Sequence, residues 1–187
     1  MEAIDALTTR VSGSELGDPA PDELELHTIL SAAARAPDHG RLRPWRFTVL
    51  KGIARDRLGA LFAEAYRRRH PDATPAQIEK EKNRPLRAPL VVVVGAKVNH
   101  ESHIPAIEQI LSGGAAAQNI MVAAFALGFG CAWKTGEAAY DPEIKSAFGL
   151  APTDAIIGFL YLGTNRMRPA TLEPVDLSDH VVEWPAA

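Results

Sequence analysis

The chain has 187 residues, of which 47% are hydrophobic and 23% charged, and its formal net charge at pH 7 is −3. This balance is typical of one globular domain with a sizeable core, and the length is short for two domains. The weakly acidic charge argues against nucleic acid or an anionic membrane as the main partner. The single cysteine, Cys131, excludes an intramolecular disulfide and fits a reducing compartment. Because the start lacks a signal-like apolar core and no apolar run reaches membrane-spanning length, we expect a cytoplasmic protein.

The first half of the chain predicts mostly helices. A short helix is expected over 1–10, with Ile4 and Leu7 on one face. Asp22 is a typical N-cap for a second helix, and Pro37 ends that helix. The other elements expected in this half are a strand over 45–50, an amphipathic helix over 55–69, and an exposed helix from Thr74 and Pro75 to about residue 86.

The second half predicts the centre of the fold. The uninterrupted apolar run over 88–98 is typical of a strand covered on both faces, as in a layered α/β sheet with parallel strands. The longest helix is expected over 104–127, and its small residues at 113–117 would allow close helix–helix contact or close approach of the backbone to a flat ligand. Shorter elements are expected at 131–136 (strand), 141–148 (helix) and 156–162 (strand).

The last segment of the chain, from about 165 to 187, is irregular and rich in proline. It nevertheless contains apolar side chains such as Leu172, Val175 and Trp184. Exposing so much apolar surface to water is unfavourable. We therefore expect a single domain over 1–187, whose tail packs on that domain or reaches over a partner subunit.

Several familiar site motifs are absent or incomplete. His100 and His103 resemble a zinc-binding pair but lie one residue too close together, so a solvated surface is the better interpretation and no metal is expected. The G-x-S-x-G, G-x-G-x-x-G and phosphate-loop motifs do not occur. Cys131 has no histidine near it in sequence and is better explained as a small core residue.

Three polar clusters do stand at junctions between expected elements. Arg10 and Ser12 offer a charge and a hydroxyl suited to a phosphate. Arg35 and His39 lie between a helix and a strand, and Trp133 begins a segment with a cation and a hydroxyl. Taken alone, each of these arginines is better explained as a solvated helix-end cation, and Trp133 as a core residue. Together they suit an anionic, planar cofactor, although composition alone does not select a flavin.

The order of these motifs along the chain resembles that of the nitroreductase family of flavin mononucleotide (FMN) enzymes, and most closely its small bacterial NAD(P)H nitroreductase branch. The resemblance implies an α+β fold with a mostly antiparallel central sheet flanked by helices, in an intertwined homodimer with FMN at the subunit interface. That expectation replaces the parallel layered sheet, and places the small-residue helix at the dimer axis. The motifs that carry the resemblance are Arg10-x-Ser12, Arg35-Ala-Pro-Asp-His39, Pro44-Trp45-x-Phe47, Gly128-Phe-Gly130-x-x-Trp133-x-x-Gly136 and Gly158-Phe-Leu-Tyr-Leu-Gly-Thr164.

The resemblance also implies roles for individual residues. No side chain is expected to act as an obligatory acid or base, because the flavin carries the chemistry. A cation, Lys134 or a nearby arginine, would stabilise the anionic reduced flavin. The implied FMN contacts are Arg10, Val11, Ser12, Arg35, His39, Trp133, Lys134 and Thr135. A stretch linked to nicotinamide binding in this branch falls on Ala123, Ala124, Phe125, Ala126, Leu127 and Gly128, which are explained equally well as core.

Two positions depart from the family pattern. Val11 stands where a second arginine is usual, and Glu15 stands where a later base is expected. Two positive charges are thus lost near a site that must hold a phosphate. The candidate replacements for these charges are Arg41, Arg43, Lys134, Arg166 and Arg168.

The implied activity is ping-pong hydride transfer from NAD(P)H, through FMN, to nitro compounds, quinones or similar small electron-poor acceptors. The lost charges leave two alternatives open. The first is a flavin-binding sensor or carrier without reductase turnover, and the second is a structural dimer that has lost the cofactor.

Overall fold

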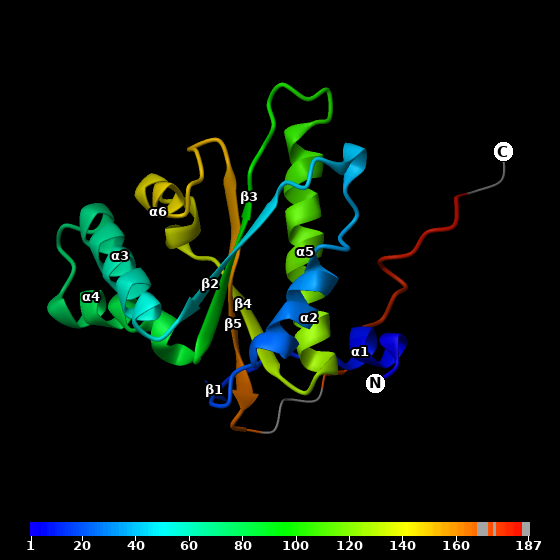
Figure 1. Ribbon diagram of the computed structural model, residues 1–187, viewed down its shortest axis with the longest axis horizontal. Helices are drawn as coiled ribbons and strands as arrows, with labels where there is room; N and C mark the ends of the chain where they lie inside the picture. Colours follow the sequence, from blue (N-terminus) through cyan, green and yellow to red (C-terminus); the bar gives the residue numbers. More distant parts are fainter. Residues whose placement is uncertain (168–171, 174, 185–187) are drawn as a thin grey trace.

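The computed structural model describes residues 1–167, 172–173 and 175–184. Its centre is a five-stranded sheet in which every strand pairing is antiparallel (Figure 1). The long strand β5 (Ala155–Asn165) pairs along one edge with β3 (Leu90–Ala96), which in turn pairs with β2 (Trp45–Lys51). Along its other edge β5 pairs with β4 (Gly130–Lys134). The last residues of β5 pair with the two-residue strand β1 (Leu16–Gly17).

The central strand β3 is buried along its whole length. Its expected burial on both faces is confirmed, whereas the parallel arrangement expected from its composition is wrong. A continuous apolar run reports that both faces are covered, but it carries no information on the direction of the neighbouring strands. The α+β fold with an antiparallel sheet, which the family resemblance implied, is confirmed.

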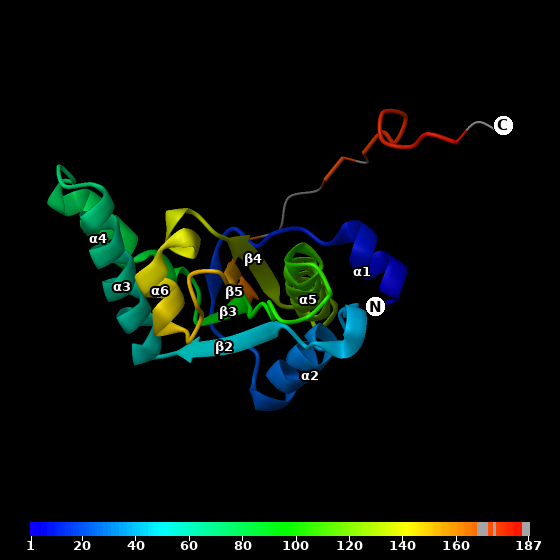
Figure 2. The same cartoon turned by 90° about the horizontal axis from the view of Figure 1, so that it is seen from above.

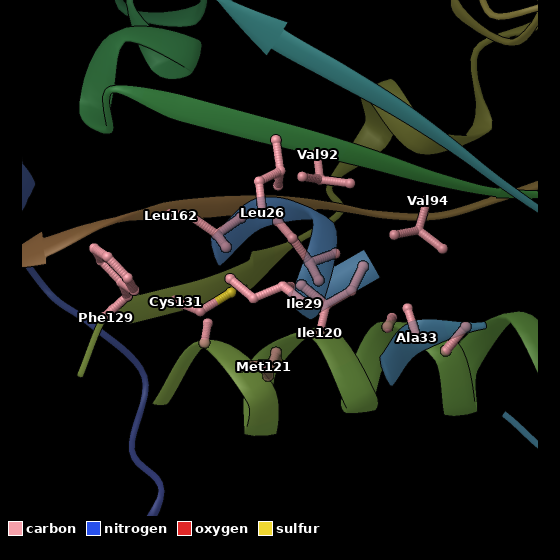
Figure 3. Close-up of a cluster of buried hydrophobic side chains, with 14 of the residues drawn as sticks. Leu26, Ile29, Ala33, Val92, Val94, Ile120, Met121, Phe129, Cys131 and Leu162 are labelled. Atoms are coloured by element: carbon pink, nitrogen blue, oxygen red, sulfur yellow. The ribbon is translucent and has the colours of Figure 1, made fainter. Parts of the chain in front are cut away.

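Helices cover the two faces of the sheet in two separate groups (Figure 2). On one face, α5 (Ala106–Ala126) and α2 (Glu23–Ala33) pack together against the sheet, and their core includes Ile29, Ile120, Cys131 and Leu160 (Figure 3). On the other face, Phe62 of α3 meets Phe159 of β5 edge-on, with ring centroids 4.9 Å apart. The elements of that second face are α3 (Ile53–Arg69), α4 (Pro75–Lys82), η2 (Arg84–Arg87), η3 (Glu137–Tyr140) and α6 (Pro142–Ala147).

Local sequence signals explain where the helices begin. The Asp22 carboxylate accepts a hydrogen bond from the backbone N–H of Glu25 at 2.8 Å, and the Glu25 carboxylate accepts one from the N–H of Asp22 at 2.9 Å. Thr74 and Gln77 form the same reciprocal capping box before α4, whose residues are all at least partly exposed. Both expected N-caps are therefore confirmed. Each box satisfies two backbone groups that a helix start leaves unpaired.

The two ends of the chain expose apolar side chains. In α1 (Ala3–Thr9) only Ala6 is buried, and Ile4 and Leu7 point to solvent. The tail residues that the structure describes form no helix or strand and leave the domain in Figure 1. Packing of the tail on its own domain and its reach over a partner subunit both stay predictions. The exposed apolar side chains of the tail are Leu172, Val175, Leu177, Val181, Val182 and Trp184.

Within the described residues, no helix is both long enough and apolar enough to cross a membrane.

Candidate functional site

The loop after α1 brings the first and third polar clusters together. The backbone N–H of Gly13 donates a hydrogen bond to the carbonyl of Cys131 at 3.0 Å, which ties this loop to β4. Burial raises the pKa of the Cys131 thiol to about 12, and the charge of Arg10 opposes that rise in part. Arg10 therefore lies near this strand. The raised pKa keeps the thiol protonated at neutral pH, as suits the core residue that the sequence predicted.

Arg10 is only partly exposed, and two of its nitrogens are fully covered. Its Nε and Nη1 atoms are buried and have no hydrogen-bond partner among the described residues. A buried donor without an acceptor costs about 1–3 kcal/mol. An anion that reached this guanidinium would remove that cost. Ser12 follows on the exposed side of the same turn, and Val11 is half-buried between them.

A pocket of about 320 Å³ lies beside this loop, where the loop faces β4 and the 3-10 helix η2. Three of its lining residues are cations: Lys134 from β4, and Arg84 and Arg87 from η2. The sequence singled out Lys134 but missed the two arginines, which stand about fifty residues earlier, next to an exposed helix. The full lining consists of Gly13, Ser14, Leu16, Arg84, Arg87, Ala132, Lys134 and Tyr161.

Trp133 has a mainly structural position. Its indole Nε1–H donates a hydrogen bond to the carbonyl of Ile157 at 3.0 Å, and the ring lies directly over Gly158. The ring also packs against the core between the sheet and α5. The next two residues, Lys134 and Thr135, are exposed at the end of β4. Within this chain, Trp133 thus holds the end of the strand in place while the residues after it reach the surface.

The second predicted cluster lies elsewhere in the chain. The 3-10 helix η1 (His39–Arg41) and the end of α2 lie across α5 from β4 (Figures 1 and 2). Arg35 lines a shallow groove between α1, α2 and α5. His39 lies 2.7 Å from a carboxylate oxygen of Glu108, measured from its Nδ1 atom, in a separate hollow. A single chain therefore does not bring Arg35 and His39 to the pocket that contains Lys134.

The loop around η1 has an unusual backbone. Arg41 and Arg43 have positive φ angles of 54° and 49°, which cost non-glycine residues about 1–2 kcal/mol each. The Asp38 carboxylate supports this conformation by accepting hydrogen bonds from the N–H of Leu42 at 3.2 Å and of Arg43 at 2.7 Å. The side chains of both arginines are exposed.

The five suggested replacement cations can now be placed. Lys134 lines the pocket, and Arg166 packs its guanidinium against Gly17, one residue from the pocket wall. Arg41 and Arg43 lie across α5 with η1, and Arg168 lies outside the described residues. Of the four that the structure describes, only Lys134 and Arg166 are therefore near the loop that has lost its charges, within one chain.

The stretch suggested for nicotinamide binding forms the end of α5. Ala124 is fully buried in the core, whereas Ala123 and Ala126 line the groove that also contains Arg35. Leu127 and Gly128 are exposed where the helix ends. This stretch therefore belongs partly to the core and partly to a surface groove. Among the described residues, no group of three or more His, Cys, Asp or Glu side chains is arranged to hold a metal ion.

This fold agrees with the comparison of the chain with known proteins. The Nitroreductase family model matches residues 7–164. The chain therefore belongs to the nitroreductase family, as its motifs indicated.

The similarity to known proteins extends over nearly the whole chain. The Escherichia coli K12 protein named Putative NAD(P)H nitroreductase YdjA is 39% identical over 171 residues, which cover 91% of this chain and 92% of that protein. Among solved structures, the nitroreductase-like family protein from Bacillus cereus has a TM-score of 0.84 at 23% identity, covering 100% of this chain and 97% of that one. A protein from Desulfovibrio desulfuricans, described as a putative nitroreductase in complex with FMN, has a TM-score of 0.74 at 20% identity, covering 100% and 99%.

Proposed function

We propose that this chain is an FMN-dependent oxidoreductase that uses NAD(P)H to reduce nitro compounds, quinones or similar electron-poor acceptors. Membership of the nitroreductase family and the NAD(P)H nitroreductase name of the E. coli relative support this activity. The FMN bound in the D. desulfuricans structure supports the choice of cofactor. We further propose that the active unit is a homodimer with FMN at the subunit interface.

The separation of the predicted site residues carries the proposal. Lys134 lines the pocket beside β4, whereas Arg35 and His39 lie in separate hollows across α5 from β4. In a dimer with two-fold symmetry, the same surface of each chain meets its copy. Such pairing would bring Arg35 and His39 of one protomer to the Lys134 side of the other. A composite site of this kind explains why one chain leaves its cations in separate places.

The residues of the β4 side fit an anionic flavin. FMN carries a phosphate, and the buried nitrogens of Arg10 have no acceptor within the described chain. The pocket beside them is lined by three cations and by Gly13 and Ser14. Charge-assisted hydrogen bonds from arginine to phosphate are among the stronger polar contacts in proteins. This chain therefore offers both a phosphate partner and a positively charged wall.

The division of labour follows from these positions. Bound FMN would accept a hydride from NAD(P)H and pass the electrons to the acceptor, which is the chemistry that the cofactor supplies. Arg10 and Ser12 would bind and orient the cofactor, and Lys134 would provide positive charge beside it. We assign no side chain the role of an acid or base.

The first test is the absorbance spectrum of the protein supplied with FMN, recorded before and after anaerobic addition of NADH or NADPH. We expect the oxidised-flavin band to disappear, and to return when a nitroaromatic or quinone is added. Initial rates measured at several fixed acceptor concentrations should give parallel double-reciprocal lines, as in a ping-pong mechanism. Bound FMN without turnover would favour the sensor or carrier instead, and a protein that takes up no FMN would refute both.

A variant tests the assignment of Arg10. Arg10→Gln should weaken FMN binding by about tenfold or more, because a hydrogen bond to a charged group contributes about 1.5–3 kcal/mol. Fluorescence quenching of free FMN measures the dissociation constant. Arg57→Gln is a matched control, since Arg57 is exposed on α3, on the other face of the sheet. Equal FMN affinity in the two variants would remove Arg10 from the site.

A further inference from the structure

The histidine of the second predicted cluster is paired with a residue that no predicted motif contains. The Nδ1 atom of His39 lies 2.7 Å from a carboxylate oxygen of Glu108, although the two residues are far apart in sequence. His39 begins η1, whereas Glu108 stands in the first turn of α5. No described residue forms a hydrogen bond with the second ring nitrogen of His39, Nε2. The pair thus leaves one edge of the imidazole free.

A second contact ties the loop of His39 to the same end of α5. Gly40 has a φ angle of +69° and lies so close to Ile104 that a Cβ atom would overlap its side chain. The carbonyl of Ile104 accepts a hydrogen bond from Nε2 of Gln109 at 3.0 Å. Gln109 is the neighbour of Glu108 and is only 3% exposed. Adjacent residues of α5 therefore hold the ring of His39 directly and the backbone after it through Ile104.

Asp38, the other acid that lines this hollow, is committed to the backbone. Its carboxylate oxygens accept hydrogen bonds from the N–H groups of Leu42 and Arg43. Asp38 therefore supports the conformation of the loop. Glu108 is the carboxylate that acts on the ring of His39.

A carboxylate fixes which ring nitrogen carries the hydrogen. An ionised carboxylate accepts hydrogen bonds and donates none, so the Nδ1 atom that faces Glu108 must carry a hydrogen. The free atom of the ring is then Nε2. This atom accepts a hydrogen bond when the ring is neutral and donates one when the ring is protonated.

We propose that Glu108 is the positioning residue of His39, which orients the imidazole so that Nε2 is the atom presented to FMN across the subunit interface. This inference rests on the proposed FMN-dependent function. Glu108 lies outside every motif that carries the family resemblance. The alternative is a purely structural role, because a carboxylate in the first turn of a helix also stabilises that helix through its dipole. The two roles differ in whether His39 is needed.

The first measurement is the imidazole nitrogen-15 NMR spectrum of the protein with and without FMN, at a pH where His39 is neutral. His39→Gln identifies the signals. In the wild type we expect hydrogen on Nδ1 and none on Nε2. In Glu108→Gln the amide can donate as well as accept, so we expect a mixture of the two forms. The matched control is Glu101→Gln, which removes the same charge at an exposed position before α5 and should keep the wild-type spectrum.

FMN dissociation constants then show whether the effect passes through His39. The paired side chains are 62% and 42% exposed, so Glu108→Gln should weaken FMN binding by about fivefold, the size expected of an exposed ion pair. In a His39→Gln background the same substitution should change FMN binding no further, because the residue that Glu108 positions is gone. Glu101→Gln should bind FMN like the wild type. Fluorescence quenching of free FMN gives the constants, and circular dichroism checks the fold.

Three results would overturn the inference. The first is a wild-type spectrum with the hydrogen of His39 on Nε2. The second is a Glu108→Gln effect on FMN binding that is equal with and without His39, which would assign Glu108 to the helix start alone. The third is a Glu108→Gln variant indistinguishable from Glu101→Gln. A wild type that takes up no FMN refutes the proposed function and the role of the pair toward FMN, while the spectrum still decides whether Glu108 orients His39.

Discussion

The helices on the two faces of the sheet differ in the side chains that they present to solvent. On the α3 face, charged side chains of the chain pair with one another. The carboxylate of Asp141, which is 6% exposed, lies 3.2 Å from Arg68 and 2.6 Å from Arg69. On the α5 face, the longest helix exposes Ile107 at 60% and Leu111 at 63%, although the α3 face also exposes Ile53 at 69%.

This difference indicates which face depends on another molecule. Long side chains that pair across α3, η3 and α6 need no partner, because each charge has its counter-charge within the chain. Exposing leucine and isoleucine of α5 to water is unfavourable, and burying them against a second copy of the chain would remove that cost. The ion pairs of the α3 face thus serve stability, and we expect the exposed apolar surface of α5 to serve assembly.

The largest effect on stability is expected on the α3 face. Asp141→Ala removes both arginine contacts and the side-chain cap of α6, where the carboxylate accepts hydrogen bonds from Glu143 and Ile144. Breaking a buried ion pair from one side leaves the other charge uncompensated, so we expect a loss of about 3 kcal/mol or more. Urea unfolding measures it. Glu79→Gln, at an exposed pair, should change stability by less than about 1 kcal/mol. Similar losses in both variants would contradict the proposed contrast.

The next effect concerns assembly through the α5 face. Leu111→Glu should convert the proposed dimer into a folded monomer. A buried leucine contributes about 1.5–3 kcal/mol and occurs twice in a symmetric dimer. The dissociation constant of the dimer should therefore rise by about 100-fold or more. Sedimentation velocity gives the oligomeric state and circular dichroism the fold. The matched control is Ile53→Glu on α3, which is equally exposed but on the other face. If Ile53→Glu dissociates the protein and Leu111→Glu does not, the faces have been assigned the wrong way round.

The smallest effect separates two adjacent glycines of α5. A Cβ atom on Gly113 would lie 2.9 Å from Cγ1 of Ile157 in β5, whereas one on Gly114 would meet nothing within 4 Å. Gly113→Ala should therefore destabilise the fold by about 1–3 kcal/mol. Gly114→Ala should stabilise the isolated chain by about 0.5–1 kcal/mol, because alanine is the better helix former.

Dimer formation gives Gly114→Ala a second readout. If the small-residue side of α5 contacts the partner closely, the same substitution should weaken dimer association while it raises the unfolding temperature of the monomer. A dimer unaffected by Gly114→Ala would show that close helix contact at this position is not used.

Local chemistry made much of the fold predictable from the sequence. Asp22 and Thr74 specify the starts of α2 and α4 through side-chain hydrogen bonds to residues three positions on, so their effect is visible in a short window. The strand β1 could not be seen this way, because its two residues pair only with the distant end of β5. The exposed faces of α1 show the same limit. A stripe of Ile4 and Leu7 predicts burial, but it does not say whether the chain itself or another chain provides it.

The sequence by itself determined the family, the positions of most helices and strands, and the polar clusters at 10–12, 35–39 and 133–135, because these depend on neighbouring residues and their order. Only the tertiary structure decided that the first and third clusters meet while the second lies across α5. Only the structure brought Arg84 and Glu81 to the end of β4. Distances between segments far apart in sequence are set by the packing of helices on a sheet, and no local pattern records them.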